Sequence, residues 1–231
     1  MKKITTLLLI GFFSLSAYSQ EKFTGIGKLK IGVDTSIIAD LVSENSLKKI
    51  KIKTFKDFLK VQSGKNYGKI NYVDGVYFAD ATEAPGVSVY QFGEIKIAGI
   101  PIEKVVLKFY NNQLYSFDSQ YSKELLNAMK TKYPDFEESS KKDTTSCINK
   151  ATGNKLSLES TMFHKKWKNG TITALATIGN YYNDKCEDKL LSFVQYNDHI
   201  ISDQVRDLEQ ELSKQKETKK AAETKAKLSD F

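Results

Sequence analysis

Histidines, cysteines and carboxylates are the side chains that could carry chemistry in this chain. The two histidines, His164 and His199, lack the helical or hairpin spacing of metal ligands. Acidic residues such as Glu94 and the pair Glu137-Glu138 lie near expected strand ends and in a polar stretch, as ordinary surface acids do. No Gly-x-Ser-x-Gly elbow, Gly-rich phosphate loop or His-Glu-x-x-His helix occurs. The pattern favours a protein that is not an enzyme and needs no metal or cofactor.

The chain has two cysteines, Cys147 and Cys186. A redox pair would place its cysteines close together in the sequence and lower a thiol pKa, so their separation favours a structural disulfide. In the chain-entropy model, a bridge across a loop of this size stabilises the fold by about 4 kcal/mol. We expect it to tie the base of a β-meander.

The N-terminus predicts export. Met1-Lys2-Lys3 is a positive n-region, residues 4–15 are apolar, and Ala17-Tyr18-Ser19 supplies small residues where a signal peptidase reads. We expect a signal peptide over residues 1–19, cleavage before Gln20, and a periplasmic or secreted bacterial protein. The apolar run is too short to span a bilayer, and no later segment is long and apolar enough, so the mature chain should have no transmembrane segment.

Charge argues against a nucleic-acid partner. The net charge is +7, and two of the lysines belong to the expected signal peptide. The positive residues are mostly lysines spread along the chain, and the denser run over residues 47–60 fits a solubilising strand face. We expect the partner to be another envelope protein, and the oligomeric state stays open.

The stretch Glu94 to Tyr133 organises the expected fold. It reads as antiparallel strands joined by an Asn111-Asn112 turn, followed by a helix that Ser122 caps and Pro134 ends. Alternation places one set of residues on a buried face: Val105, Leu107, Phe109 and Leu114. The opposite face is unusually aromatic and carries Val106, Lys108, Tyr110, Tyr115 and Phe117.

This aromatic face is the candidate partner surface, because tyrosine rings bury area at small entropic cost. Its expected contact residues are Lys108, Tyr110, Tyr115 and Phe117. The C-terminal helix adds an apolar seam of Val205, Leu208 and Leu212. Two alternatives stay open: a second structural layer covers the aromatic face, and the C-terminal helix is only a solvated extension.

The expected fold class is α+β, with antiparallel meander sheets, packed helices and a charged C-terminal helix. After the signal peptide, we expect a first α+β unit over residues 20–135, a β-meander over 136–200 that packs on or continues it, and the charged helix over 201–231. Residues 137–146 are polar and without periodicity, and read as a loop. Similar capping at Asp34 and Ser122 suggests two related halves, and chance agreement is the alternative.

A capped helix within residues 29–42, and strands around a Phe-x-Asn-Asn-x-Leu turn within residues 105–117, resemble small exported modules of the SmpA and β-lactamase-inhibitor-protein type. This resemblance implies a non-catalytic protein-binding module. We therefore expect an exported, non-enzymatic binding or assembly module of the bacterial cell envelope. The alternatives are a small exported hydrolase with a carboxylate-based site and a carrier of apolar ligands.

Overall fold

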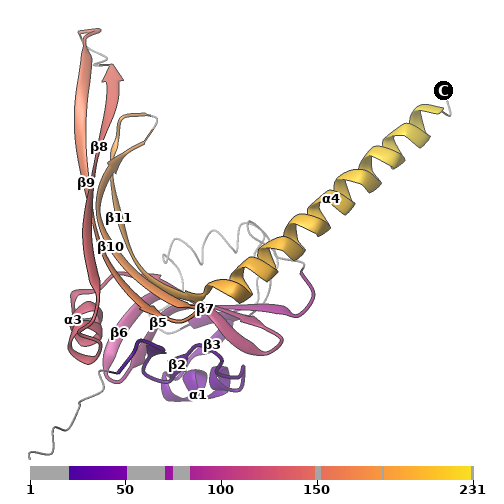
Figure 1. Cartoon of the computed structure of the whole chain (residues 1–231). Helices are drawn as coiled ribbons and strands as arrows, with labels where there is room; N and C mark the ends of the chain where they lie inside the picture. Colours follow the sequence, from indigo (N-terminus) through magenta and orange to yellow (C-terminus); the bar gives the residue numbers. More distant parts are fainter. Residues whose placement is uncertain (1–20, 51–70, 75–83, 149–151, 184, 230–231) are drawn as a thin grey trace, which may run out of the picture.

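The computed structural model describes residues 21–50, 71–74, 84–148, 152–183 and 185–229 (Figure 1). The expected signal peptide therefore lies outside the described residues. A short ribbon pairs β1 (Gly25–Ile26) with β2 (Leu29–Lys30). The described helices are α1 (Ile37–Glu44), α3 (Lys123–Lys132) and α4 (His199–Ser229).

The other described strands form one sheet in the order β3-β4-β5-β6-β7-β11-β10-β9-β8. Their bounds are β3 (Lys48–Ile50), β4 (Asn71–Asp74), β5 (Val87–Ile97), β6 (Ile100–Tyr110), β7 (Gln113–Gln120), β8 (Glu137–Ile148), β9 (Lys155–Asn169), β10 (Ile172–Tyr182) and β11 (Asp188–Asp198). Every pair is antiparallel except β3 with β4. The expected α+β class, with mostly antiparallel sheet and a C-terminal helix, is confirmed, and the sheet makes up more of the fold than expected.

The sheet contains two antiparallel series of four strands. These are β4 to β7 and β8 to β11; α3 directly precedes the second series, whereas β3, which pairs parallel with β4, stands between α1 and the first. The last strands of the two series, β7 and β11, pair with each other from Ser116↔Asn197 to Gln120↔Phe193. The sheet therefore runs without a break from one part to the other, and the boundary expected near residue 135 stays a prediction.

The core lies between α1, α3 and one face of the curved sheet (Figure 1). The face predicted to be buried is fully inaccessible: Val105, Leu107, Phe109 and Leu114. The Ser122 side chain accepts the Leu125 N–H at 3.0 Å, so the expected N-cap of α3 is confirmed. Leu125, Leu126 and Met129 form its buried stripe.

An aromatic cluster joins the N-terminal segment to this core. The Phe23 ring centroid lies 5.0 Å from that of Tyr133, 5.3 Å from Tyr196 and 6.3 Å from Trp167. The Trp167 indole N–H donates to the Tyr133 carbonyl oxygen at 2.8 Å, and the Tyr133 hydroxyl donates to the Gly25 carbonyl oxygen at 2.9 Å. Buried polar atoms are thus paired where β9, β11, α3 and the N-terminal segment meet.

The loop expected over residues 137–146 is wrong, because these residues belong to strand β8. β8 pairs with β9 without interruption from Glu137↔Lys166 to Ile148↔Lys155. Residues 137–144 are all exposed, so both faces of the strand meet water over this length. A strand without a buried face needs no alternation of apolar and polar residues, which removes the pattern that identifies strands in a sequence.

The distal parts of β8 to β11 leave the core and form what we call the β arm, residues 139–148, 152–163, 178–183 and 185–192. The arm and α4 project from the same side of the core and diverge (Figure 1). Pairing between β9 and β10 stops at Met162↔Gly179, so beyond this point the arm consists of two hairpins, β8-β9 and β10-β11.

The expected disulfide between Cys147 and Cys186 is confirmed, with a Cα–Cα distance of 5.9 Å. We expected the bridge to tie the base of the meander, and this expectation is wrong. Cys147 lies near the distal end of β8, and Cys186 lies in the turn between β10 and β11. The bridge therefore joins the two hairpins of the β arm after their strands have separated.

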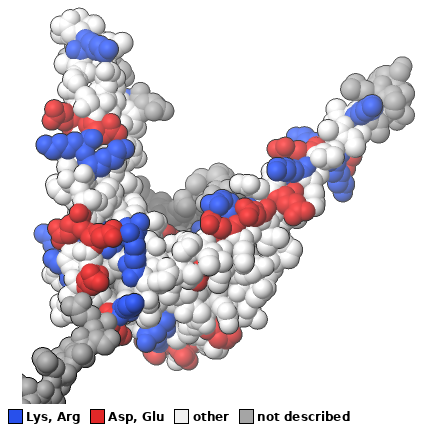
Figure 2. Space-filling view, in the orientation of Figure 1, with Lys and Arg blue, Asp and Glu red and all other residues white. Residues whose placement is uncertain are grey.

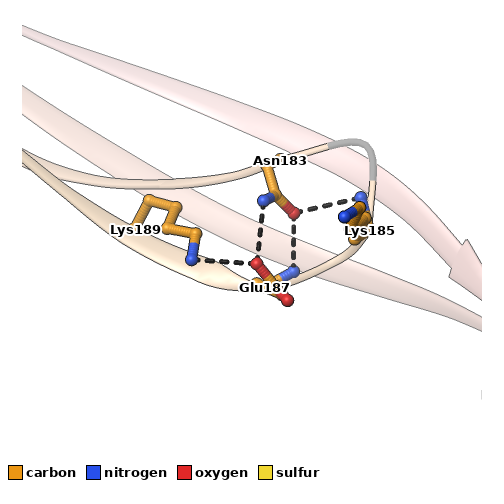
Figure 3. Close-up of polar contacts among 4 residues, drawn as sticks. All are labelled: Asn183, Lys185, Glu187 and Lys189. Carbon is orange, nitrogen blue, oxygen red and sulfur yellow. Dashed lines mark hydrogen bonds and ion pairs between the residues drawn. The ribbon is translucent and has the colours of Figure 1, made fainter. Parts of the chain in front are cut away.

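Polar contacts hold the turn that presents Cys186 (Figure 3). The Asn183 side-chain oxygen accepts the backbone N–H groups of Lys185 and Glu187, both at 3.0 Å. The Asn183 amide donates to the Glu187 carboxylate at 3.0 Å, and the Lys189 ammonium lies 2.9 Å from the same carboxylate. Cys186 has a φ of 61°, an uncommon conformation that this network supports.

Candidate interaction surfaces

The start of α4 is fixed to the sheet by Asp198. Its Oδ1 accepts the backbone N–H groups of Ile200 at 3.0 Å and Ile201 at 3.2 Å, so Asp198 caps the helix. Its Oδ2 accepts the Thr171 hydroxyl at 2.7 Å, which ties the cap to the β9-β10 turn. The direction in which α4 leaves the core is thus set by side chains of the sheet.

The predicted partner face does not exist as one surface. The Asn111-Asn112 turn has the expected positive φ angles, 49° and 65°, and the pair Phe109↔Leu114 is confirmed. A β-bulge then inserts one residue into β7, so Leu107 faces Phe117.

Phe117 consequently lies in the core at 0% exposure and stacks on Tyr196 with centroids 4.6 Å apart. The expectation that Phe117 shares a face with Tyr110 is therefore wrong, because the bulge changes the alternation along β7. Phe117 has no surface to offer a partner.

Tyr115 occupies the bulge and is 5% exposed. Burial raises the pKa of its phenol well above the ordinary value, and the charges of Glu209 on α4 and Asp118 on β7 act in the same direction. The first turns of α4 contact β7 and β11, and Val205 is buried there. α4 therefore forms a second layer over this part of the sheet.

The remaining residues of the predicted surface are partly accessible. Lys108 and Tyr110 on β6 are half-buried, as are Leu208 and Leu212 on α4. These four side chains are therefore accessible to a partner, whereas Tyr115, Phe117 and Val205 are buried.

Asp118 is a carboxylate held in the covered region. Burial raises its pKa, while the Lys108 ammonium and the Ser116 hydroxyl, which donates to Oδ2 at 3.5 Å, lower it. The net direction is upward, so the folded protein disfavours the charged form of this side chain.

The Asp118→Asn variant is therefore expected to melt at a higher temperature than the wild type at pH 7. A raised folded-state pKa contributes stability that is present in acid and is lost as the pH rises through that pKa. The advantage of the variant should disappear below about pH 4, where the wild-type carboxyl is protonated in both states. Thermal unfolding across this pH range is the measurement.

Asp135→Asn, at an exposed position, is the matched control and should leave the melting temperature nearly unchanged. A lower melting temperature for Asp118→Asn at pH 7 would contradict the expectation and would mean that Lys108 holds a charged Asp118.

The β arm carries the exposed apolar residues. Among the described residues, the large apolar side chains that are exposed all lie on the arm except Ile200: Ile148 (70%), Leu156 (40%), Phe163 (56%), Tyr181 (38%) and Leu190 (73%). Little in the sequence indicates this exposure, because a strand pattern does not show whether an apolar residue faces a core or water. Ile148, alone at the end of a threonine-rich polar run, was the available signal.

Charged side chains on the arm gather in bands separated by uncharged surface (Figure 2). Near the core, Glu137 lies 2.9 Å from the Lys168 ammonium, and Glu138 pairs with Lys165. These contacts lower the pKa of both glutamates through hydrogen bonding to the lysines. The charges at the foot of the arm are thus paired across β8 and β9.

Within the described residues, no three His, Cys, Asp or Glu side chains are placed to hold a metal ion. His164 Nδ1 lies 2.9 Å from the Thr177 hydroxyl, and His199 Nδ1 lies 2.6 Å from the Thr171 carbonyl oxygen. A shallow pocket of about 210 Å³ lies beside Glu44 and Glu94. The Glu44 carboxylate at this pocket pairs with Lys28.

Comparison of the chain with protein-family models, with curated proteins and with solved structures finds no match in any of the three. The resemblance to the SmpA and β-lactamase-inhibitor-protein type therefore stays a prediction. In the part of the chain that the structure describes, no helix has the length and apolar character needed to cross a membrane.

Proposed function

We propose that this chain is an exported, non-enzymatic binding or assembly module of the bacterial cell envelope, and that the β arm is its main contact with another envelope protein. The observation that carries the proposal is the group of exposed apolar side chains on the arm, away from the core. Single exposed apolar residues are common, but a group on one projecting element marks an interaction site.

The construction of the arm supports this role. None of the described helices covers the arm (Figure 1), and its two hairpins are held by strand pairing, the Cys147–Cys186 bridge and the Asn183 turn network. A pre-organised surface loses less conformational entropy on binding than a flexible one. The arm therefore presents Leu190 and Tyr181 in fixed positions on opposite faces of the β10-β11 hairpin, because Leu190 is opposite Asn180 and Tyr181 is opposite Lys189.

α4 provides a second contact in this proposal. The helix has 31 residues, which at about 1.5 Å per residue is roughly 46 Å of length. Only its first turns are packed on the sheet, and residues 213–225 are exposed. The half-buried Leu208 and Leu212 mark the point where the helix leaves the core, and they remain candidates together with Lys108 and Tyr110.

The matching order of the two parts supports their origin as related halves. Each contains four consecutive antiparallel strands, and the sheet is continuous because the fourth strands, β7 and β11, pair. In this interpretation, the second half differs from the first by the β arm and α4. We propose that these two elements bind the partner.

A pull-down from envelope extracts tests the proposed function. The mature chain is immobilised as wild type, as a Leu190→Glu/Tyr181→Glu variant, and as an Ala39→Glu control on α1 at the opposite end of the molecule. We expect wild type and control to retain the same envelope protein, and the arm variant to retain at least tenfold less. Equal retention by all three forms, or no retained protein, would contradict the proposal.

A further inference from the structure

The outer edge of β8 is uncovered. Among the described strands, β8 is the last of the sheet and pairs with β9 alone. The exposure of residues 137–144 shows that none of the described residues covers this side. The edge thus presents a row of backbone N–H and C=O groups without strand partners.

Folded proteins usually guard such edges with short strands, proline, bulges or charged side chains. β8 is 12 residues long, has no proline, and keeps an unbroken register with β9. Its charged residues all lie within positions 137–143, at Glu137, Glu138, Lys141, Lys142 and Asp143. The distal segment, Thr144 to Ile148, carries no charge, and although the Cys147 side chain is buried in its disulfide, Thr144, Ser146 and Ile148 are exposed, so no charged side chain guards this part of the edge.

We propose that β8 of a second copy of this chain pairs antiparallel with this edge, around a twofold axis beside Thr144. Two copies of the same strand edge can exchange backbone hydrogen bonds when they run antiparallel. Such a contact uses the same surface on both copies and is the isologous contact of a twofold dimer. The inference goes beyond the proposed function, because it assigns the edge of the arm to self-association and leaves Leu190 and Tyr181 for the envelope partner.

Charge restricts the register. In an antiparallel pair, directly opposed residues point to the same face of the sheet. A twofold axis perpendicular to the sheet also leaves each side chain on its original face. The axis therefore has to pass next to one residue and its own copy, and cannot pass midway between two successive residues. An axis beside Lys142 opposes two lysines, and an axis beside Asp143 opposes two carboxylates. With the axis beside Thr144, Lys142 faces Ser146 of the second copy, and like charges are not opposed.

The same register covers exposed apolar surface. Ile148 of one copy then lies opposite Ser140 of the other, and Ser140 is the partner of Phe163 on β9. Ile148 and Phe163, 70% and 56% exposed, therefore fall in one row on one face, separated by the small serine. An axis beside Thr145 would instead place the Lys142 ammonium opposite Ile148.

The shape of the molecule permits this pairing. The core lies at the foot of the arm, next to Glu137, while the axis lies seven positions further along β8 (Figure 1). At about 3.3 Å per residue, each core is more than about 20 Å from the axis, on opposite sides. The two arms can pair edge to edge while the two cores stay apart.

Sedimentation velocity over a range of protein concentrations tests the inference. Thr144→Pro and Thr145→Pro each remove one backbone N–H, and adjacent residues of a strand direct this group to opposite sides. One variant therefore loses only the outward donor and keeps the wild-type melting temperature, and the other loses a β8-β9 hydrogen bond. We expect a wild-type dimer whose dissociation constant rises about tenfold or more in the outward variant, because the loss occurs twice across the axis.

Phe163→Ser gives a second measurement that does not depend on backbone changes, and it should weaken the dimer in the same direction. The Leu190→Glu/Tyr181→Glu variant should dimerise as the wild type does, which separates this result from the test of the envelope partner. A wild-type chain that stays monomeric at the highest concentration would overturn the inference. A dimer that neither proline nor Phe163→Ser weakens would also overturn it.

Discussion

Replacing Phe23 with alanine is expected to lower the free energy of unfolding by about 3–5 kcal/mol. The Phe23 ring packs against Tyr133, Trp167 and Tyr196, and it is 2% exposed. Alanine would leave a cavity between rings that are held in place by their own hydrogen bonds, so the site cannot collapse to fill it. Urea unfolding followed by far-UV circular dichroism measures the loss.

Phe163→Ala is the matched control, because it makes the same chemical change at a ring that is 56% exposed. At low protein concentration, this variant should unfold within about 0.5 kcal/mol of the wild type. Equal effects at the two positions would contradict the placement of Phe23 in the core.

Removal of the disulfide in a Cys147→Ser/Cys186→Ser variant should destabilise the arm, with a loss of up to about 4 kcal/mol in the chain-entropy model. The bridge joins the two hairpins beyond the end of β9-β10 pairing, at a distance from the aromatic cluster. We therefore expect faster amide hydrogen exchange in the β arm, while the fluorescence of the single tryptophan, Trp167, still reports a folded core.

Free-thiol labelling of the unreduced protein is the accompanying control and should find no reactive cysteine. Two labelled thiols would contradict the disulfide. Simultaneous loss of arm protection and of the native Trp167 signal in the double variant would show that the arm and the core unfold as one unit.

Local signals explain what the sequence predicted correctly. Asn111-Asn112 marks a turn through the conformational tolerance of asparagine, and Ser122 marks a helix start through its side-chain oxygen. Both act within a few residues, so one sequence is enough to find them. The Cys147–Cys186 pair was predicted because the chain contains no other cysteine.

Features that depend on contacts between distant segments were not predicted. The bulge at Tyr115 depends on how β7 fits between β6 and β11, and it moves Phe117 from the predicted surface into the core. The candidate interaction surface was likewise only partly predicted. Leu190 sits in a strand pattern that fits a core as well as it fits water, and the structure alone shows it exposed.

The pairing of β7 with β11 has a consequence for how the chain folds. These strands come from opposite parts of the chain, and the Phe23 cluster also needs Tyr196 from β11. Hairpins form early because their contacts are local, whereas contacts between distant segments carry the entropy of closing a long loop. The core can therefore close only when the chain is available from Phe23 to Asp198, and until then β7 remains an open edge.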